Sequence, residues 1–249
     1  MKIHWDISEY DIQRVTDFIN ENQNPFVKNR IDRNINRQSI LINNNAILKT
    51  IAMCLLTSQQ RSGPNTPVAA FLRQNPFPLT EENLAENNNI EQHIREVLLQ
   101  NNLNRYINKI PAFFTSNFKF LQNTNWDIFN NLESRLNQYS TKETERVIAD
   151  NIADSLTGLG PKQARNFLQA LGLTKYEVPI DSRITIWLQN FGFPITLSSK
   201  ALQDKGYYHF VSDGIQILCK KANIYPCVLD AAIFSSFDTG QWNQENIVF

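Results

Sequence analysis

The sequence predicts an all-α protein, and three observations support this fold class. Apolar residues recur at three- and four-residue spacing through most of the 249-residue chain, as they do on the buried faces of amphipathic helices. Alternation of apolar and polar residues, which would indicate strands, does not persist beyond a few residues. A hydrophobic fraction of 42% and an aromatic fraction of 11% are typical of a globular chain with a sizeable core.

Individual helices can be placed from their caps and apolar faces. Ser8 is a typical N-cap residue, and Ile12 and Val15 follow it on one helical face. Ser140 and Glu143 form a capping-box pattern at the start of a later helix. In chain order, helices are predicted from Ser8 onward and over 39–56, 90–99, 103–120 with an interruption at Pro111, 126–136, 141–156, 162–171, 184–191, 197–205, 208–222 and 226–237.

Asparagine is very frequent and gathers in two segments, 20–45 and 83–104. Such biased stretches are predicted to be loops or frayed helix ends. No internal repeat is visible, so the helices are expected to pack as individual elements rather than as a repeat array.

The most informative segment is a short Gly-x-Gly turn between two amphipathic helices. Gly158 and Gly160 permit a positive φ or a close backbone approach, and Pro161 suits the first position of the following helix. Gly172 is a typical residue just past the end of that helix. Tight-turn amides and a helix N-terminus can hold a phosphate without reading base sequence, so this helix-hairpin-helix predicts contact with a nucleic-acid backbone.

A lysine and an aspartate accompany the turn. Lys162 starts the second helix, and Asp181 of the sequence Val-Pro-Ile-Asp follows nineteen positions later (181 − 162). Asp181 precedes an apolar stretch from Ile184, so it can cap a helix while a short loop folds its carboxylate toward the lysine amine. A lysine alone at a helix start is usually just solvated, but beside a carboxylate a neutral amine is suited to nucleophilic attack.

The segments GLGPKQA at 158–164 and VPID at 178–181 resemble the motifs of the helix-hairpin-helix Gly/Pro-Asp superfamily of DNA glycosylases, most of all the 8-oxoguanine DNA glycosylases with abasic-site lyase activity. The resemblance is tight over 156–188 and loose elsewhere. It implies a bifunctional base-excision repair enzyme that removes an oxidised purine through a lysine Schiff base and β-elimination. Lys162 would be the nucleophile, and Asp181 would stabilise positive charge on the sugar.

The resemblance also implies DNA-binding residues. Gly158 and Gly160 would contact the backbone, as would Arg183, which stands where many relatives have histidine. Gln59 or Gln60 would fill the hole left by a flipped base, although both could equally be solvent-exposed loop residues.

Three further residues are predicted to form a pocket for the extruded base. Asp230 and Phe234 lie four positions apart and therefore share one helical face, which matches the spacing of base-contacting residues in the family. Asn166 follows Lys162 by four positions, where relatives place base-pocket residues of varied identity. A core phenylalanine is the alternative interpretation of Phe234.

The resemblance implies two helical subdomains on either side of a cleft. The central subdomain would comprise residues 46–182 and contain the hairpin. The second subdomain would be built from both chain ends, 1–45 and 183–249. At this length there is no room for the additional N-terminal β-domain of the mammalian-type enzymes.

No cofactor is expected. Cys54, Cys219 and Cys227 are too few for the four-cysteine iron–sulfur loop of some superfamily members, and the three histidines lack metal-ligand spacing. The resemblance implies only a monovalent cation on backbone carbonyls at Leu156, Gly158 and Gly160, without side-chain ligands.

Charge and hydropathy limit the expected partners. Basic and acidic residues are equal at 24 each, so overall charge does not indicate a nucleic-acid partner, but the segment 159–190 has four basic and two acidic residues, which is compatible with a few phosphate contacts. No apolar run approaches the ~20 residues of a membrane span. The resemblance then implies a cytoplasmic, nucleoid-associated monomer that acts on double-stranded DNA containing a damaged base.

Two alternatives remain open at this point. The same chemistry could act on another lesion, such as an oxidised pyrimidine, although the missing iron–sulfur loop and the Asp230/Phe234 pair weigh against this. The hairpin could also belong to a non-catalytic DNA-binding module, but such a module has no need for the Lys162/Asp181 pair.

Overall fold

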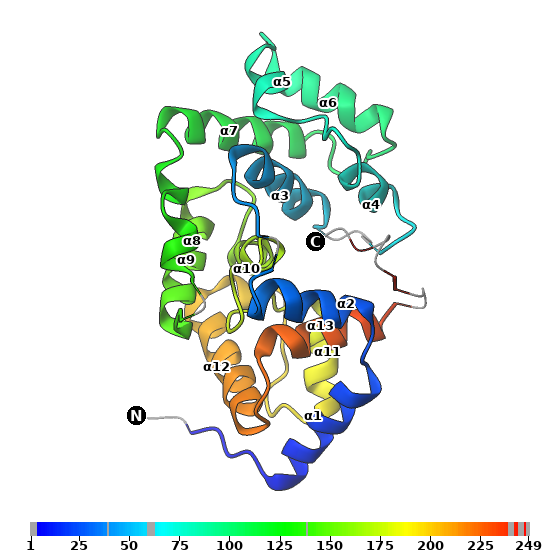
Figure 1. The fold of residues 1–249 in the computed structure, drawn as a ribbon, viewed down its shortest axis with the longest axis vertical. Helices are drawn as coiled ribbons and strands as arrows, with labels where there is room; N and C mark the ends of the chain where they lie inside the picture. The colour runs from blue at the N-terminus through cyan, green and yellow to red at the C-terminus, as the bar shows by residue number, and fades with distance from the viewer. Residues whose placement is uncertain are drawn as a thin grey trace.

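The computed structural model describes residues 4–38, 40–58, 63–137, 139–238, 242–243 and 247. Within these ranges all regular structure is helical and no strand occurs, which confirms the predicted all-α fold (Figure 1). None of the described helices is long and apolar enough to span a membrane. The elements are α1 (Glu9–Glu21), α2 (Pro25–Arg30), the π-helix η1 (Ile31–Ile35), α3 (Asn44–Leu56), α4 (Pro67–Leu72), α5 (Glu81–Ala85), α6 (Ile90–Gln100), α7 (Ile110–Asn123), the 3₁₀-helix η2 (Asp127–Phe129), α8 (Leu132–Arg135), α9 (Lys142–Ser155), α10 (Pro161–Ala170), α11 (Ser182–Phe191), the 3₁₀-helix η3 (Ala201–Gln203), α12 (Lys205–Lys221) and α13 (Pro226–Ser236).

The buried apolar side chains form two cores. The first is built from α3 to α10, and the second from α1, α2 and α11 to α13. Figure 1 shows these groups as the upper and lower parts of the molecule, with α10 viewed nearly end-on between them. Val178 and Ile180, which lie inside the predicted 46–182 subdomain, pack into the second core. The exact subdomain boundaries stay a prediction.

The hairpin helices α9 and α10 pack against each other through their apolar faces. Contrary to the predicted capping box, Thr141 rather than Ser140 is the N-cap of α9, and its hydroxyl accepts a hydrogen bond from the Thr144 amide. The Ser140 hydroxyl donates instead to the carboxylate of Glu145 at 3.2 Å. The cap is displaced by one residue because Ser140 has a buried partner of its own.

The asparagine-rich segments are more helical than predicted. Asn24, Asn43 and Asn89 are N-caps whose side-chain oxygens accept first-turn amide hydrogens of α2, α3 and α6. Asparagine therefore marks helix starts here, because its short side chain reaches amides that have no partner within the helix. The prediction of loops or frayed ends was wrong for α2, η1 and α5.

Three predicted helices are shorter than expected. Pro111 does not interrupt a helix over 103–120, because α7 begins at Ile110 and the proline occupies its first turn, where the missing N–H costs nothing. The predicted helix over 126–136 is reduced to η2 and α8, since Trp126 and Asn131 adopt left-handed backbone conformations. The predicted helix over 197–205 is only the 3₁₀ turn η3, after which α12 begins.

Candidate active site

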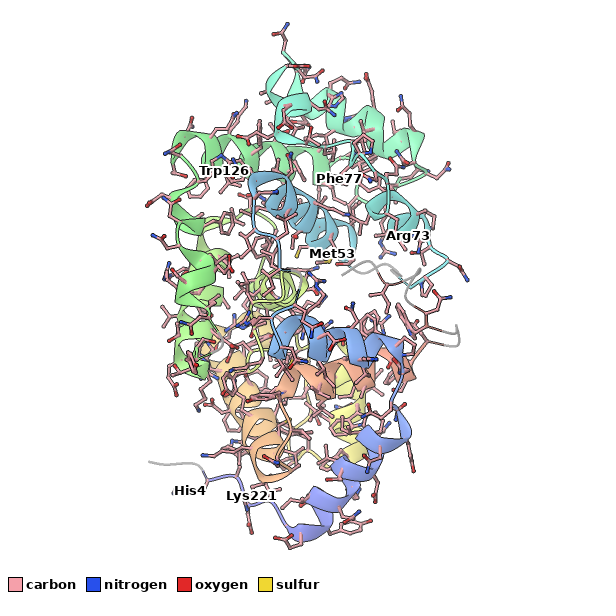
Figure 2. The ribbon with its side chains drawn as sticks, viewed as in Figure 1. His4, Met53, Arg73, Phe77, Trp126 and Lys221 are labelled. Carbon is pink, nitrogen blue, oxygen red and sulfur yellow. The ribbon has the colours of Figure 1, made fainter. Side chains whose placement is uncertain are left out.

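A cleft of about 940 Å³ lies between the two cores. The hairpin turn, α10, the loop before α11, and helices α2 and α13 contribute to its walls. Met53, labelled in Figure 2, contributes from α3 on the upper side. The structure brings most of the predicted site residues together on this surface: Gly158, Gly160, Lys162, Asn166, Asp181, Arg183, Asp230 and Phe234 all line it.

The two glycines of the turn are needed for different structural reasons. Gly158 adopts φ +84°, and a Cβ at this position would lie 2.7 Å from the Phe113 ring and 2.8 Å from a Leu55 methyl group. Gly160 has extended backbone and serves as the N-cap of α10, with space limited by the side-chain oxygen of Gln203 at 3.2 Å. Only glycine fits at position 158. At position 160 a Cβ would contact only the Gln203 side chain, which could move away.

Lys162 is the second residue of α10 and is half-buried in the cleft wall. Behind it lies Cys54 of α3, whose thiol donates to the Gln163 carbonyl at 3.4 Å. Burial raises the pKa of the Cys54 thiol, and the nearby Lys162 charge lowers it in part. The amine therefore emerges from a helix N-terminus with a neutral thiol behind it.

Asp181 is the N-cap of α11, as predicted from sequence. Its Oδ1 accepts hydrogen bonds from the backbone amides of Arg183 at 2.8 Å and Ile184 at 3.1 Å. Its Oδ2 is 3.4 Å from a guanidinium nitrogen of Arg183. The cap thus uses one oxygen and fixes the carboxylate at the cleft surface.

Buried carboxylates hold the loop between α10 and α11. Glu145 of α9 accepts amide hydrogens from Lys175, Tyr176 and Glu177. Burial raises the pKa of Glu145, and these hydrogen bonds oppose the rise. Glu177 in turn accepts from Arg165 at 2.8 Å and is fully buried. The loop that ends at Asp181 is therefore fixed to both hairpin helices.

The C-terminal end of α10 is capped by side chains of η1 and the residues after it. Arg33 donates to the Ala170 carbonyl at 2.7 Å, and Asn34 donates to the carbonyls of Gln169 and Thr174. Burial lowers the pKa of Arg33 to about 10, and the neighbouring Arg30 contributes to the shift. Positive charge at a helix C-terminus is favourable, so α10 is anchored at the end opposite the lysine.

Aromatic rings form the wall around Phe234. Its ring stacks on the Phe26 ring of α2 with 5.1 Å between centroids, and the centroid of the Trp242 ring lies 4.5 Å from that of Phe26. The Arg183 guanidinium lies 4.1 Å above the Phe234 ring. Phe234 is only partly buried, so it faces the cleft rather than the interior of the core.

Asp230 is the main charged group of this wall. Its carboxylate is 3.1 Å from a guanidinium nitrogen of Arg30, and both side chains are largely buried. Burial raises the pKa of Asp230 to about 6, with Asp181 adding to the rise and Arg30 opposing it. The side-chain amide of Gln169 lies near the Asp230 carboxylate and lowers the pKa of Asp230. Its Nε2 nevertheless has no hydrogen-bond partner of normal geometry among the described residues.

Asn166 lies one turn after Lys162 on α10. Its side-chain amide donates to the side-chain oxygen of Gln163 at 3.1 Å and approaches the Met53 sulfur at 3.4 Å. Asn166 therefore lies on the cleft wall between the predicted nucleophile and Gln169.

Three further predictions concern Gln59 and Gln60, the backbone cation site and the absence of a cofactor. Gln59 and Gln60 lie outside the described residues. At the predicted cation site, the carbonyls of Leu156 and Gly160 accept backbone hydrogen bonds from Leu159 and Ala164, and each keeps a second lone pair. Side chains in the described ranges form no group of three metal ligands, and the expected absence of a cofactor stays a prediction.

The cleft residues that sequence reasoning missed include Phe26, Arg30, Gln169 and Trp242. Gln169 could have been found, because it follows Lys162 by seven positions and therefore shares its helical face. Phe26 and Arg30 are spaced by four within a helix that begins with Asn-Pro, a start signal obscured by the asparagine-rich context. No local pattern identifies Trp242.

The fold was compared with known proteins. No family model matches the sequence, and no curated protein sequence matches it. Among solved structures, the 8-oxoguanine DNA glycosylase of Thermotoga maritima has a TM-score of 0.66 at 13% identity, covering 94% of this chain and 99% of that one. The 8-oxoguanine glycosylase/lyase of Methanocaldococcus jannaschii, in complex with DNA containing 8-oxoguanine, has a TM-score of 0.63 at 18% identity, covering 93% and 99%.

A second structure of the Methanocaldococcus jannaschii 8-oxoguanine DNA glycosylase gives a TM-score of 0.60 at 17% identity, covering 94% of this chain and 98% of that one. All three similarities extend over nearly the full length of both chains, so the arrangement of the whole molecule is shared rather than the hairpin alone. The fold implied by the hairpin and Val-Pro-Ile-Asp motifs is thus confirmed: this chain has the fold of the 8-oxoguanine DNA glycosylases.

Proposed function

We propose that this protein is a DNA base-excision repair glycosylase with β-lyase activity that removes 8-oxoguanine from duplex DNA. The observation that carries this proposal is one cleft in which Lys162 and Asp181 lie on the same surface as an aromatic wall with a buried carboxylate. The similar solved structures, which are 8-oxoguanine glycosylases, support the assignment of the substrate.

In the proposed reaction, the neutral amine of Lys162 attacks C1′ of the damaged nucleotide. A carbon–nitrogen bond forms to the lysine as the glycosidic bond breaks, and the base leaves with the electron pair and takes up a proton. The ring-opened sugar becomes a Schiff base on Lys162, and loss of a proton from C2′ expels the 3′ phosphate by β-elimination. The Asp181 carboxylate stabilises the positive charge that develops on the sugar.

The DNA backbone would be held at the hairpin. The amides of the turn and the N-terminus of α10 offer an anion site beside Gly158 and Gly160, without base-specific contacts. Arg183 would contact a neighbouring phosphate, which requires its guanidinium to leave the Phe234 ring. All these groups come from one chain, so a monomer provides a complete site.

The extruded base would enter between α10 and α13. Phe234, backed by Phe26, supplies an apolar surface for stacking. The edge of a guanine base carries two neighbouring donors, N1–H and N2–H, and an acceptor, O6. The Asp230 carboxylate can accept from both donors, and the Nε2 of Gln169, which lies near Asp230 without a hydrogen bond of normal geometry in the described part of the chain, can donate to the acceptor. Adenine presents an acceptor at N1, a donor at its 6-amino group and only a C–H at C2, so the wall favours a guanine derivative.

Borohydride trapping tests this proposal. The protein is incubated with duplexes that carry 8-oxoguanine, thymine glycol, an abasic site or no lesion, and the Schiff base is reduced to a stable adduct. We expect an adduct on 8-oxoguanine that is lost in Lys162→Gln. Lys119→Gln, the same change at an exposed position of α7 outside the cleft, is the matched control and should trap like the wild type.

The other outcomes identify the alternatives. Trapping on thymine glycol but not on 8-oxoguanine would retain the mechanism and reject the substrate. Trapping on the abasic site alone would indicate a lyase without base removal. No adduct on any duplex, with DNA binding preserved in Lys162→Gln, would indicate a non-catalytic DNA-binding module.

A further inference from the structure

The loop that carries Asp181 is bridged by a side chain from α12. Tyr208 is fully buried, and its hydroxyl contacts the two peptide groups on either side of Pro179. It accepts a hydrogen bond from the Ile180 amide at 2.8 Å and donates one to the Val178 carbonyl at 2.8 Å. Both lengths are normal for strong hydrogen bonds, so one hydroxyl satisfies both backbone groups.

This bridge matters because the loop has little regular structure of its own. Pro179 has no N–H to donate, and the next residues lead directly into the Asp181 cap. Burial raises the pKa of Tyr208 above its ordinary value, which keeps the proton that the hydroxyl donates to Val178. The peptide groups just before Asp181 are therefore held by a group that remains protonated at neutral pH.

The same tyrosine is also connected to the first turn of α10, which carries Lys162. The Arg165 guanidinium lies 4.6 Å above the Tyr208 ring. Arg165 donates to the Pro161 carbonyl at 3.3 Å, one residue before Lys162, and to Glu177 at 2.8 Å. A continuous set of contacts thus runs from the backbone beside the lysine, through Arg165 and Tyr208, to the backbone beside Asp181.

We propose that Tyr208 is a positioning residue that sets the location of the Asp181 carboxylate relative to Lys162. This inference rests on the proposed function. Tyr208 does not line the cleft, so it acts through the loop and not through contact with DNA. Geometry at a reacting centre is sensitive, and a displacement of about 1 Å can lower a rate by roughly 10²-fold.

The test removes the hydroxyl and keeps the ring. Tyr208→Phe is compared with Tyr207→Phe, the neighbouring tyrosine of α12, whose hydroxyl is 3.4 Å from the Thr196 carbonyl at the surface. Two quantities are measured: the single-turnover rate of base release with enzyme in excess over an 8-oxoguanine duplex, and the Kd for a duplex with a tetrahydrofuran abasic analogue. Circular dichroism at the assay temperature verifies that each variant is folded.

We expect the single-turnover rate of Tyr208→Phe to fall about 10- to 100-fold while the Kd stays within a factor of about two. Tyr207→Phe should match the wild type in both quantities. A double mutant distinguishes positioning from general support. In an Asp181→Asn background, Tyr208→Phe should change the residual rate little, because the group that it positions is already altered.

Three outcomes would overturn the inference. These are a Tyr208→Phe rate equal to that of Tyr207→Phe, the same fold loss in the wild-type and Asp181→Asn backgrounds, or a Kd that weakens in parallel with the rate. If Tyr208→Phe does not fold, Tyr208→p-aminophenylalanine, which keeps a donor to Val178 and weakens the acceptor for Ile180, is taken through the same comparison. A wild-type protein inactive on every lesion duplex would instead reject the proposed function.

Discussion

The two walls of the cleft differ in how they are built. The hairpin wall, with Lys162 and Asp181, comes from about 25 consecutive residues and is held by a network of buried charges. The base wall joins α2 to α13, and its central ion pair, Arg30 with Asp230, links residues 200 positions apart. Its other contacts are mainly aromatic.

This difference suggests that the two walls have separate roles, one in catalysis and backbone binding and the other in base recognition. A local, rigidly held hairpin can supply chemistry and backbone grip for any nucleotide, because neither requires a particular base. In the proposed function, the wall assembled from both ends of the chain would present the groups that distinguish one base from another. Changes in the hairpin wall should therefore alter rate and folding, whereas changes in the base wall should alter the choice of lesion.

The largest effect is expected from Asp181→Asn. The amide retains an oxygen that can cap α11, so stability should change little, but the negative charge beside the sugar is lost. The single-turnover rate of base release should fall by roughly 10²–10⁴-fold with an unchanged melting temperature. A rate within a few-fold of the wild type would remove Asp181 from the mechanism.

The second-largest effect is expected on the free energy of unfolding rather than on the reaction rate. Glu177→Gln removes the fully buried carboxylate that pairs with Arg165 and Arg146 and leaves these arginines only the more exposed Asp150 and Asp213. The free energy of unfolding should fall by about 3–5 kcal/mol, which urea denaturation measures. Glu143→Gln, the same change on a largely exposed side chain, is the control and should cost less than about 1 kcal/mol. Equal effects at both positions would mean that the buried network does not support the hairpin wall.

Asp230 should make recognition of the base dependent on pH. Its pKa is raised from 3.8 to about 6, so the folded protein holds a proton on this carboxyl between these values. The stabilisation associated with that proton is fully present below about pH 4 and is lost as the pH rises through about 6. Acceptance of two hydrogen bonds from guanine requires the carboxylate, so preference for 8-oxoguanine over 8-oxoadenine should increase as the pH rises through about 6.

Asp230→Asn checks this interpretation. The amide oxygen of the substituted side chain can accept one hydrogen bond from the base, but the amide nitrogen would face the second donor of guanine. The preference for 8-oxoguanine over 8-oxoadenine at pH 7.5 should therefore fall by roughly tenfold. The preference should also lose its dependence on pH near 6. A pH profile that persists unchanged in Asp230→Asn would assign the titration to another group.

The smallest effect is expected from Phe234→Leu. Leucine keeps part of the apolar contact, so loss of the aromatic face should cost no more than about 1 kcal/mol in binding of the extruded base, the low end of the range for removal of a stacking side chain. Base release from 8-oxoguanine duplexes should weaken accordingly, while β-elimination at a preformed abasic site should stay within about twofold, because no base is bound there. An equal loss in both reactions would show that the two walls are not separable.

Much of the hairpin wall could be predicted from sequence because its signals are local. Gly158 is required by a positive φ, Pro161 occupies a first helical turn, and Asp181 caps the helix that follows it. Each of these depends on neighbours within a few residues, so the pattern of residue types carries the geometry directly.

The base wall and the supports of the loop were decided by tertiary structure. Arg30 and Asp230 meet only because α2 packs on α13, and Tyr208 reaches the Asp181 loop from a helix 28 to 30 residues further along the chain. Such pairings depend on how helices pack across the molecule, for which the spacing of residues in one segment contains no signal. The sequence by itself determined most of the helices, the turn and the candidate chemistry. Packing of distant helices decided which polar groups became buried, what they paired with, and which of them line the cleft.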